Sequence, residues 1–199
     1  MGFFDRFKKE KIEAKPDIMT IPYDYSGYDI AFESGRTNPK IYEEINSLIT
    51  GSSYNIADIE GYLTLTTDSS GDEFLEFYDN WLEKLIEEDY VIHQDSHLNI
   101  IGLANGFNLL LDKIGSDKKL DVETVVNRYK GQLSRYTFNG EDLKDDFVYD
   151  ILEANIVADE LRKIGYELIS LFDGNDNCDK TVIRIEDIEK MSAIESRIK

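Results

Sequence analysis

The sequence predicts an α+β protein dominated by helices, about six of them, beside a small and largely antiparallel sheet. Three observations lead to this class. Apolar residues recur at helical spacing in several long stretches. Short alternating stretches rich in β-branched residues are typical of strands. Near the end of the chain, two such stretches flank a segment dense in turn formers, which favours a β-hairpin.

The composition is that of a folded protein. The chain has 199 residues, of which 41% are hydrophobic and 12% aromatic, with only 3 prolines. Its length favours one main domain, so we expect a basic, aromatic arm over residues 1–16 and a single α+β domain over residues 17–199. The single cysteine, Cys178, cannot form an internal disulfide, which favours a reducing compartment.

The arm differs in charge from the rest of the chain. Residues 1–15 contain three phenylalanines, five bases and three acids, so the arm is +2 and the remainder −21. Pro16 ends any helix that the arm forms. Attachment to a membrane surface is one interpretation. Docking of the arm onto its own domain, or disorder, is favoured because anionic lipid repels so negative a body.

The first third of the chain predicts strands at residues 18–23 and 62–67, because side chains alternate there. Between them, Thr37 is the expected N-cap of a helix that Gly51 ends. After the second strand, Ser70 and Glu73 form a capping-box pattern. The helix that they begin has apolar residues on one stripe: Phe74, Phe77, Tyr78, Trp81, Leu82 and Leu85.

The rest of the chain predicts more helices and the hairpin. Helical spacing favours helices over residues 100–114, 121–136 and 141–164, the last ended by Gly165. Strands are expected over residues 166–172 and 181–185, followed by an amphipathic helix through Ile198. Because an isolated hairpin is marginally stable, we expect residues 62–67 to supply its third strand.

The charge excludes some functions. A formal charge of −19 repels phosphate backbones, so nucleic-acid binding is not expected. No apolar stretch is long enough for a transmembrane segment and no export signal is evident, so we expect a cytoplasmic protein. An acidic surface can attract a basic protein partner, or can simply keep the protein soluble. The oligomeric state stays open.

The densest run of acids covers residues 141–160, with eight acids and one base. On an amphipathic helix such a run is commonly the solvated face. If the protein has an acidic interface, the residues predicted to bind the partner are Asp142, Asp145, Asp146 and Asp150.

Two patterns suggest metal sites but fit poorly. His93 and His97 have the spacing of helical zinc ligands, yet Gln94 replaces the usual glutamate and residues 90–92 look extended. Asp173, Asn175 and Asn177 match the start of a calcium-binding EF-hand loop. That match fails where glycine and glutamate are required, since Cys178 and Arg184 stand there. A polar turn explains this segment.

The sequence therefore predicts no catalytic, cofactor-binding or metal-binding residue. Acidic neighbours disfavour the thiolate of Cys178, and the chain lacks a phosphate-binding loop, a GxSxG elbow and a CxxC pair. A hydrolase-type enzyme with a carboxylate or histidine–carboxylate metal site stays open as the alternative, because 41 acids form many close pairs by chance.

The C-terminal part carries a resemblance. The run from Ile164-Gly165-Tyr166-Glu167-Leu168 to Thr181-Val182-Ile183-Arg184-Ile185 resembles the end of an uncharacterised bacterial domain family, over about the last fifty residues. In that family a long acidic helix leads into a strand, a polar turn and a return strand. Small acidic domains of this kind are often immunity proteins that bind and block a toxin. The resemblance thus implies a protein-binding module of the immunity or antitoxin type.

Overall fold

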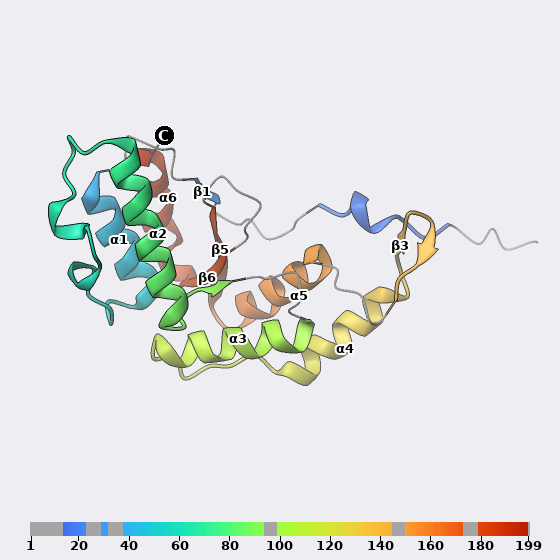
Figure 1. The fold of residues 1–199 in the computed structure, drawn as a ribbon. Helices are drawn as coiled ribbons and strands as arrows, with labels where there is room; N and C mark the ends of the chain where they lie inside the picture. Colours follow the sequence, from blue (N-terminus) through green and yellow to red (C-terminus); the bar gives the residue numbers. More distant parts are fainter. Residues whose placement is uncertain are drawn as a thin grey trace, which may run out of the picture.

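The chain folds into an α+β structure with helices on both sides of a small central sheet (Figure 1). The computed structural model describes residues 14–22, 29–31, 38–93, 99–144, 150–172 and 179–198. Within these ranges it contains six α-helices: α1 (Pro39–Thr50), α2 (Gly71–Glu87), α3 (Ile100–Lys113), α4 (Val122–Leu133), α5 (Asp150–Lys163) and α6 (Ile188–Ile198). The predicted fold class is confirmed.

The central sheet has the strand order β1-β5-β6-β2. Its core is the predicted C-terminal hairpin, in which β5 (Tyr166–Phe172) pairs with β6 (Asp179–Arg184) in antiparallel fashion. The edge strands are short: β1 (Asp29–Ala31) runs parallel to β5, and β2 (Ile92–His93) runs antiparallel to β6.

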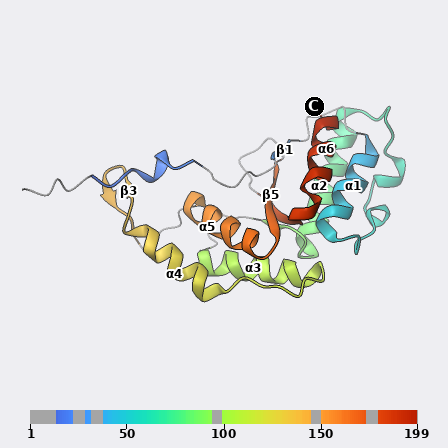
Figure 2. The ribbon, with the colours of Figure 1, turned by 180° about the vertical axis from the view of Figure 1, so that it is seen from behind.

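Both faces of the hairpin are buried, and each belongs to a different hydrophobic cluster. Leu168 and Val182 pack with α3, α4 and α5, whereas Ile169, Leu171 and Ile183 pack with α1, α2 and α6. The alternation of side chains along a strand produces this division. Figures 1 and 2, seen from opposite sides, show the same two groups of helices on either side of the strands.

The packing of α1 against α2 follows the predicted stripes. The capping box at Ser70 and Glu73 is present. Trp81 is fully buried, and its Nε1 donates a hydrogen bond of 3.1 Å to Oδ1 of Asn46 on α1. The Tyr42 ring packs edge-on against Trp81, with 5.5 Å between the ring centroids. The cap of α1 is Asn38, one residue after the predicted Thr37.

Helix α3, on the other side of the sheet from α1 and α2, packs closely onto β2. A Cβ atom added to Gly106 of α3 would lie 3.3 Å from Cδ1 of Ile92, so the glycine allows helix and strand to approach.

Helix α4 is capped by Asp121 and ends at Leu133, three residues before the expected Tyr136.

Both strands predicted in the first third of the chain are wrong. Residues 62–67 contain the 3₁₀ helix η3 (Tyr62–Thr64), and residues 18–23 contain η1 (Ile18–Thr20). Their amides bond locally instead of to a neighbouring strand, as in the 3.1 Å bond from the N–H of Leu65 to the carbonyl of Tyr62. The hairpin therefore takes its neighbouring strands from β1 and β2.

The helix predicted over residues 141–164 corresponds to α5 (Asp150–Lys163), and residues 141–144 are not helical. Before it lies a second, two-stranded sheet of β3 (Thr137–Phe138) and β4 (Glu141–Asp142). Its turn residues Asn139 and Gly140 have φ of 52° and 82°, which is the left-handed backbone that a tight hairpin turn requires. An Asn-Gly pair is a strong hairpin signal.

The segment before β1 holds this second sheet. The carbonyl of Pro16 accepts a 3.0 Å hydrogen bond from the N–H of Thr137, and Oδ2 of Asp17 accepts one of 2.8 Å from the N–H of Asn139. Ile18 is buried in the cluster with α3, α4 and α5.

Several sequence predictions fall outside the described residues. They concern residues 1–13 of the arm, His97, the EF-hand-like positions 173–177 and Cys178. Among the described helices, none is long and apolar enough to span a membrane.

Candidate functional site

The structure describes two of the four predicted partner-binding residues, and they lie in different elements. Asp142 lies on β4, where its Oδ1 is 2.5 Å from Nζ of Lys15, and Asp150 is the first residue of α5. Asp145 and Asp146 fall outside the described residues. The helix expected to carry these residues does not include Asp142, because a hairpin occupies the beginning of the segment.

At the end of residues 141–160, bases of α4 and α5 pair with two of the acids. Arg128 of α4 reaches Asp159 at 2.7 Å and Glu160 at 2.5 Å, and Lys163 reaches Glu160 at 2.7 Å. Burial raises the pKa of Glu160, but hydrogen bonds from Lys163 and Arg128 outweigh it and leave that pKa below its usual value. Three acids of the run, Asp142, Asp159 and Glu160, thus form ion pairs within the protein.

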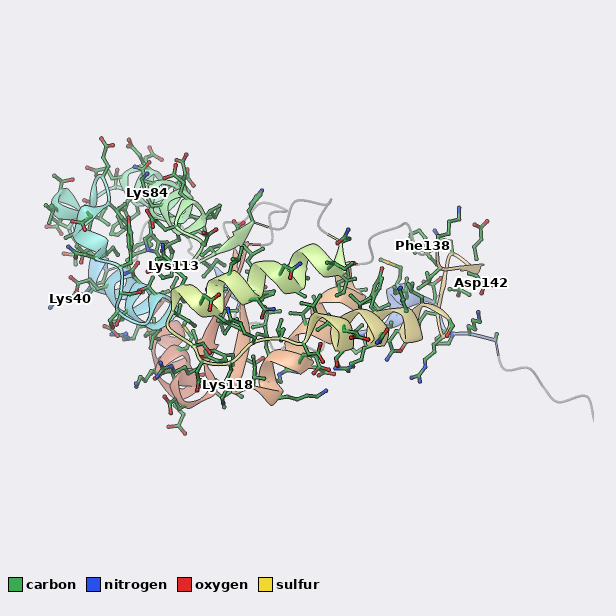
Figure 3. The ribbon with its side chains drawn as sticks, turned by 90° about the horizontal axis from the view of Figure 1, so that it is seen from below. Lys40, Lys84, Lys113, Lys118, Phe138 and Asp142 are labelled. Atoms are coloured by element: carbon green, nitrogen blue, oxygen red, sulfur yellow. The ribbon has the colours of Figure 1, made fainter. Side chains whose placement is uncertain are left out.

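A different part of the chain carries most of the net negative charge. Residues 38–93 hold 13 acids and two bases, which gives −11 and leaves −8 for all other residues. All 13 acids are exposed. The two bases, Lys40 and Lys84, are labelled in Figure 3, at the opposite end of the molecule from Asp142.

Five of these acids lie in a line along helix α2, which we call the acidic ridge. It consists of Asp72, Glu76, Asp79, Glu83 and Glu87, at successive spacings of four, three, four and four residues. This spacing places them on one side of the helix, opposite the buried stripe. At 1.5 Å per residue the ridge is about 22 Å long.

The acidic ridge lowers the stability of its own helix. Acids three or four residues apart on a helix repel each other by about 0.2–0.5 kcal/mol per pair, and the ridge contains four successive pairs. Lys84, the only base on α2, forms an ion pair with Glu87 and offsets part of this repulsion. Surface charges that oppose the local rules of stability are expected at functional sites.

An apolar edge runs beside the ridge. Leu75 follows Asp72 by three residues and precedes Asp79 by four, and it is 47% exposed. Leu82 and Ile86 continue the same edge at seven and eleven residues from Leu75 and are largely buried. The outer surface of α2 therefore offers both a line of negative charge and an adjacent exposed leucine.

The histidine spacing does not lie on a helix in the described residues. His93 lies at the end of β2, which agrees with the extended structure expected just before it, and His97 falls outside the described residues. The Nδ1 atom of His93 is 2.6 Å from Oδ1 of Asp179, whose carboxylate is buried. In the part of the chain that the structure describes, no group of three or more His, Cys, Asp or Glu side chains could hold a metal ion.

A polar layer lies inside the protein between β5, β6 and α5. Ser170 and Lys180 are directly opposite each other in the sheet, and Glu153 comes from α5. All three are at most 4% exposed, and Oγ of Ser170 has no hydrogen-bond partner among the described residues. Because solvent hardly reaches these groups, they are not a surface binding site.

Two adjoining hollows lie along α1. The larger, about 550 Å³, lies between α1 and α6 over Leu48, Ala193 and Ile194, and the smaller is about 220 Å³. The ends of α1 and α3 line the smaller hollow together with Arg184 and Lys190. Both bases have acidic partners, Arg184 with Glu186 at 3.5 Å and Lys190 with Asp187 at 2.5 Å.

The acidic ridge with its apolar edge is the best-defined candidate site in the described residues. The sequence signal for it was available, because acids recur at helical spacing opposite a stripe of apolar residues. Comparison of this chain with protein-family models, curated proteins and solved structures finds no match.

Proposed function

We propose that this protein is a non-enzymatic protein-binding module, of the immunity or antitoxin kind, that captures a basic partner on its acidic surface. The observation that carries the proposal is the acidic ridge on α2. Its five exposed acids lie in line, and the whole helix has only one base. The same proposal includes a bacterial source and a cytoplasmic location. The resemblance of the C-terminal segment to small acidic domains supports the choice of partner class.

The electrostatics favour capture of a cation. Neighbouring acids on the ridge are about one helical turn apart, which is well within the Debye length of about 10 Å at 0.1 M salt. A basic surface therefore experiences the ridge as one extended negative region, which increases the rate of association. Higher salt should weaken this effect.

The test compares two variants with equal net charge. The ridge variant carries Glu76→Gln, Asp79→Asn and Glu83→Gln, and the control carries Asp117→Asn, Glu123→Gln and Glu189→Gln at exposed acids elsewhere. Both reduce the formal charge from −19 to −16. Fluorescence anisotropy of a labelled twelve-lysine peptide should show about tenfold weaker binding to the ridge variant than to the control. Equal affinities of the two variants would remove the ridge as the binding surface.

A second candidate function is a hydrolase-type enzyme that uses His93. The observation in its favour is the buried Asp179 carboxylate, which fixes the imidazole through Nδ1 and leaves Nε2 to act as a base or metal ligand. Elemental analysis of protein purified without chelators tests the metal version. A stoichiometric transition metal that is lost on His93→Gln would favour the enzyme over the binding module.

A further inference from the structure

We infer that the partner presents a basic amphipathic helix, which lies lengthwise along α2 with an apolar side chain against Leu75. This inference rests on the proposed function and adds the shape of the binding element. It follows from the spacing of the acids, the position of Leu75 beside them, and the absence of any described element over these exposed side chains.

The spacing of the ridge matches a helix better than a strand. From Asp72 to Glu87 the acids lie at about 0, 6, 10.5, 16.5 and 22.5 Å along the helix axis. Bases at positions i, i+4, i+7, i+11 and i+15 of a second helix repeat these distances. Bases at alternate residues of a strand are about 6.7 Å apart, so the fifth base would lie about 4 Å beyond the fifth acid.

The apolar edge determines which kind of helix fits. Leu75 is 47% exposed and flanks the ridge between Asp72 and Asp79. A helix with bases alone would cover this leucine with charged groups, whereas an amphipathic helix can place an apolar side chain there. Two helices pack with their axes about 8–10 Å apart, a distance that the long side chains of lysine and arginine span.

The experiment uses the full chain and two labelled probe peptides of identical composition. The first is a lactam-stapled helix with lysines at i, i+4, i+7 and i+11 and leucines on the adjacent face. The second has the same residues in an order that alternates lysine and leucine, and it is unstapled. Fluorescence anisotropy at about 0.05 M and 0.5 M salt measures both affinities.

The stapled helix should bind at least about fivefold more tightly than the alternating peptide at low salt. Leu75→Ala should weaken the stapled helix about three- to tenfold, and the control Leu109→Ala, at an exposed leucine of α3, should leave it unchanged. Equal binding of both peptides, with no effect of Leu75→Ala, would overturn the helix inference and leave the proposed function standing. Failure of both peptides to bind at low salt would overturn the proposed function itself.

Discussion

Neutralising the acidic ridge should make the protein more stable while weakening its binding. The change is the ridge variant with Glu76→Gln, Asp79→Asn and Glu83→Gln, which removes one or both charges from all four successive acid pairs of α2. At about 0.2–0.5 kcal/mol per pair, the free energy of unfolding should rise by about 1–2 kcal/mol. The substitutions hardly change helix propensity, because Gln resembles Glu and Asn resembles Asp in this respect.

The assay is thermal and urea denaturation followed by tryptophan fluorescence. Trp81 is the only tryptophan and is fully buried, so its emission reports the loss of the core around α1 and α2. For a chain of this size, the expected gain raises Tm by about 2–8 °C at low salt. Most of the gain should disappear in 1 M salt, where the Debye length falls to about 3 Å.

The variant with Asp117→Asn, Glu123→Gln and Glu189→Gln is the matched control. Glu123 and Glu189 lie in the first turns of α4 and α6, where a negative charge is favourable to the helix dipole. This control should therefore be no more stable than the wild type. If ridge and control variants have the same Tm, or if the gain persists in 1 M salt, repulsion along α2 is not the cause and the reasoning fails.

Three further predictions concern the fold. Asn46→Ala removes the acceptor of the 3.1 Å hydrogen bond from buried Trp81 and should lower the free energy of unfolding by about 1–3 kcal/mol in urea denaturation. Ile18→Ala should cost about 2–5 kcal/mol, because Ile18 is 1% exposed; a negligible change would show that residues 14–22 do not dock in solution. A hydrogen bond from Arg197 lowers the pKa of Glu44, so the stability from this pair is present above the unfolded pKa and is lost as pH falls through the lower folded value. Arg197→Gln should reduce this acid-dependent loss in thermal denaturation between about pH 5 and pH 3.

The elements with long apolar stripes were predictable from the sequence. Helix α2 has its apolar stripe and its capping box within one short segment, so local preference and burial agree. The hairpin of β5 and β6 was equally visible, because Gly165 and a polar turn bracket its strands. Strands β1 and β2 were not predictable. They have only three and two residues respectively, which are too few to show a period, and their pairing depends on distant parts of the chain.

The ion pairs within the acidic run could not be predicted from the sequence, for a physical reason. A count of acids along residues 141–160 cannot reveal that Arg128, from another helix, neutralises Asp159 and Glu160. The Asn139-Gly140 turn was present in the sequence, but the helical interpretation of the acids that follow concealed it. Net charge locates a surface only after the partners from other elements are known.

The position of the hairpin in the chain has a consequence for synthesis on the ribosome. Helices α1 to α5 are all made before β5 and β6, yet both hydrophobic clusters need these two strands. At about 5–20 residues per second, roughly 7 to 30 s separate the translation of Pro39 from that of Arg184. During this interval the nascent helices lack the surface on which they finally pack, and the negative charge of residues 38–93 helps to keep them from associating with other chains.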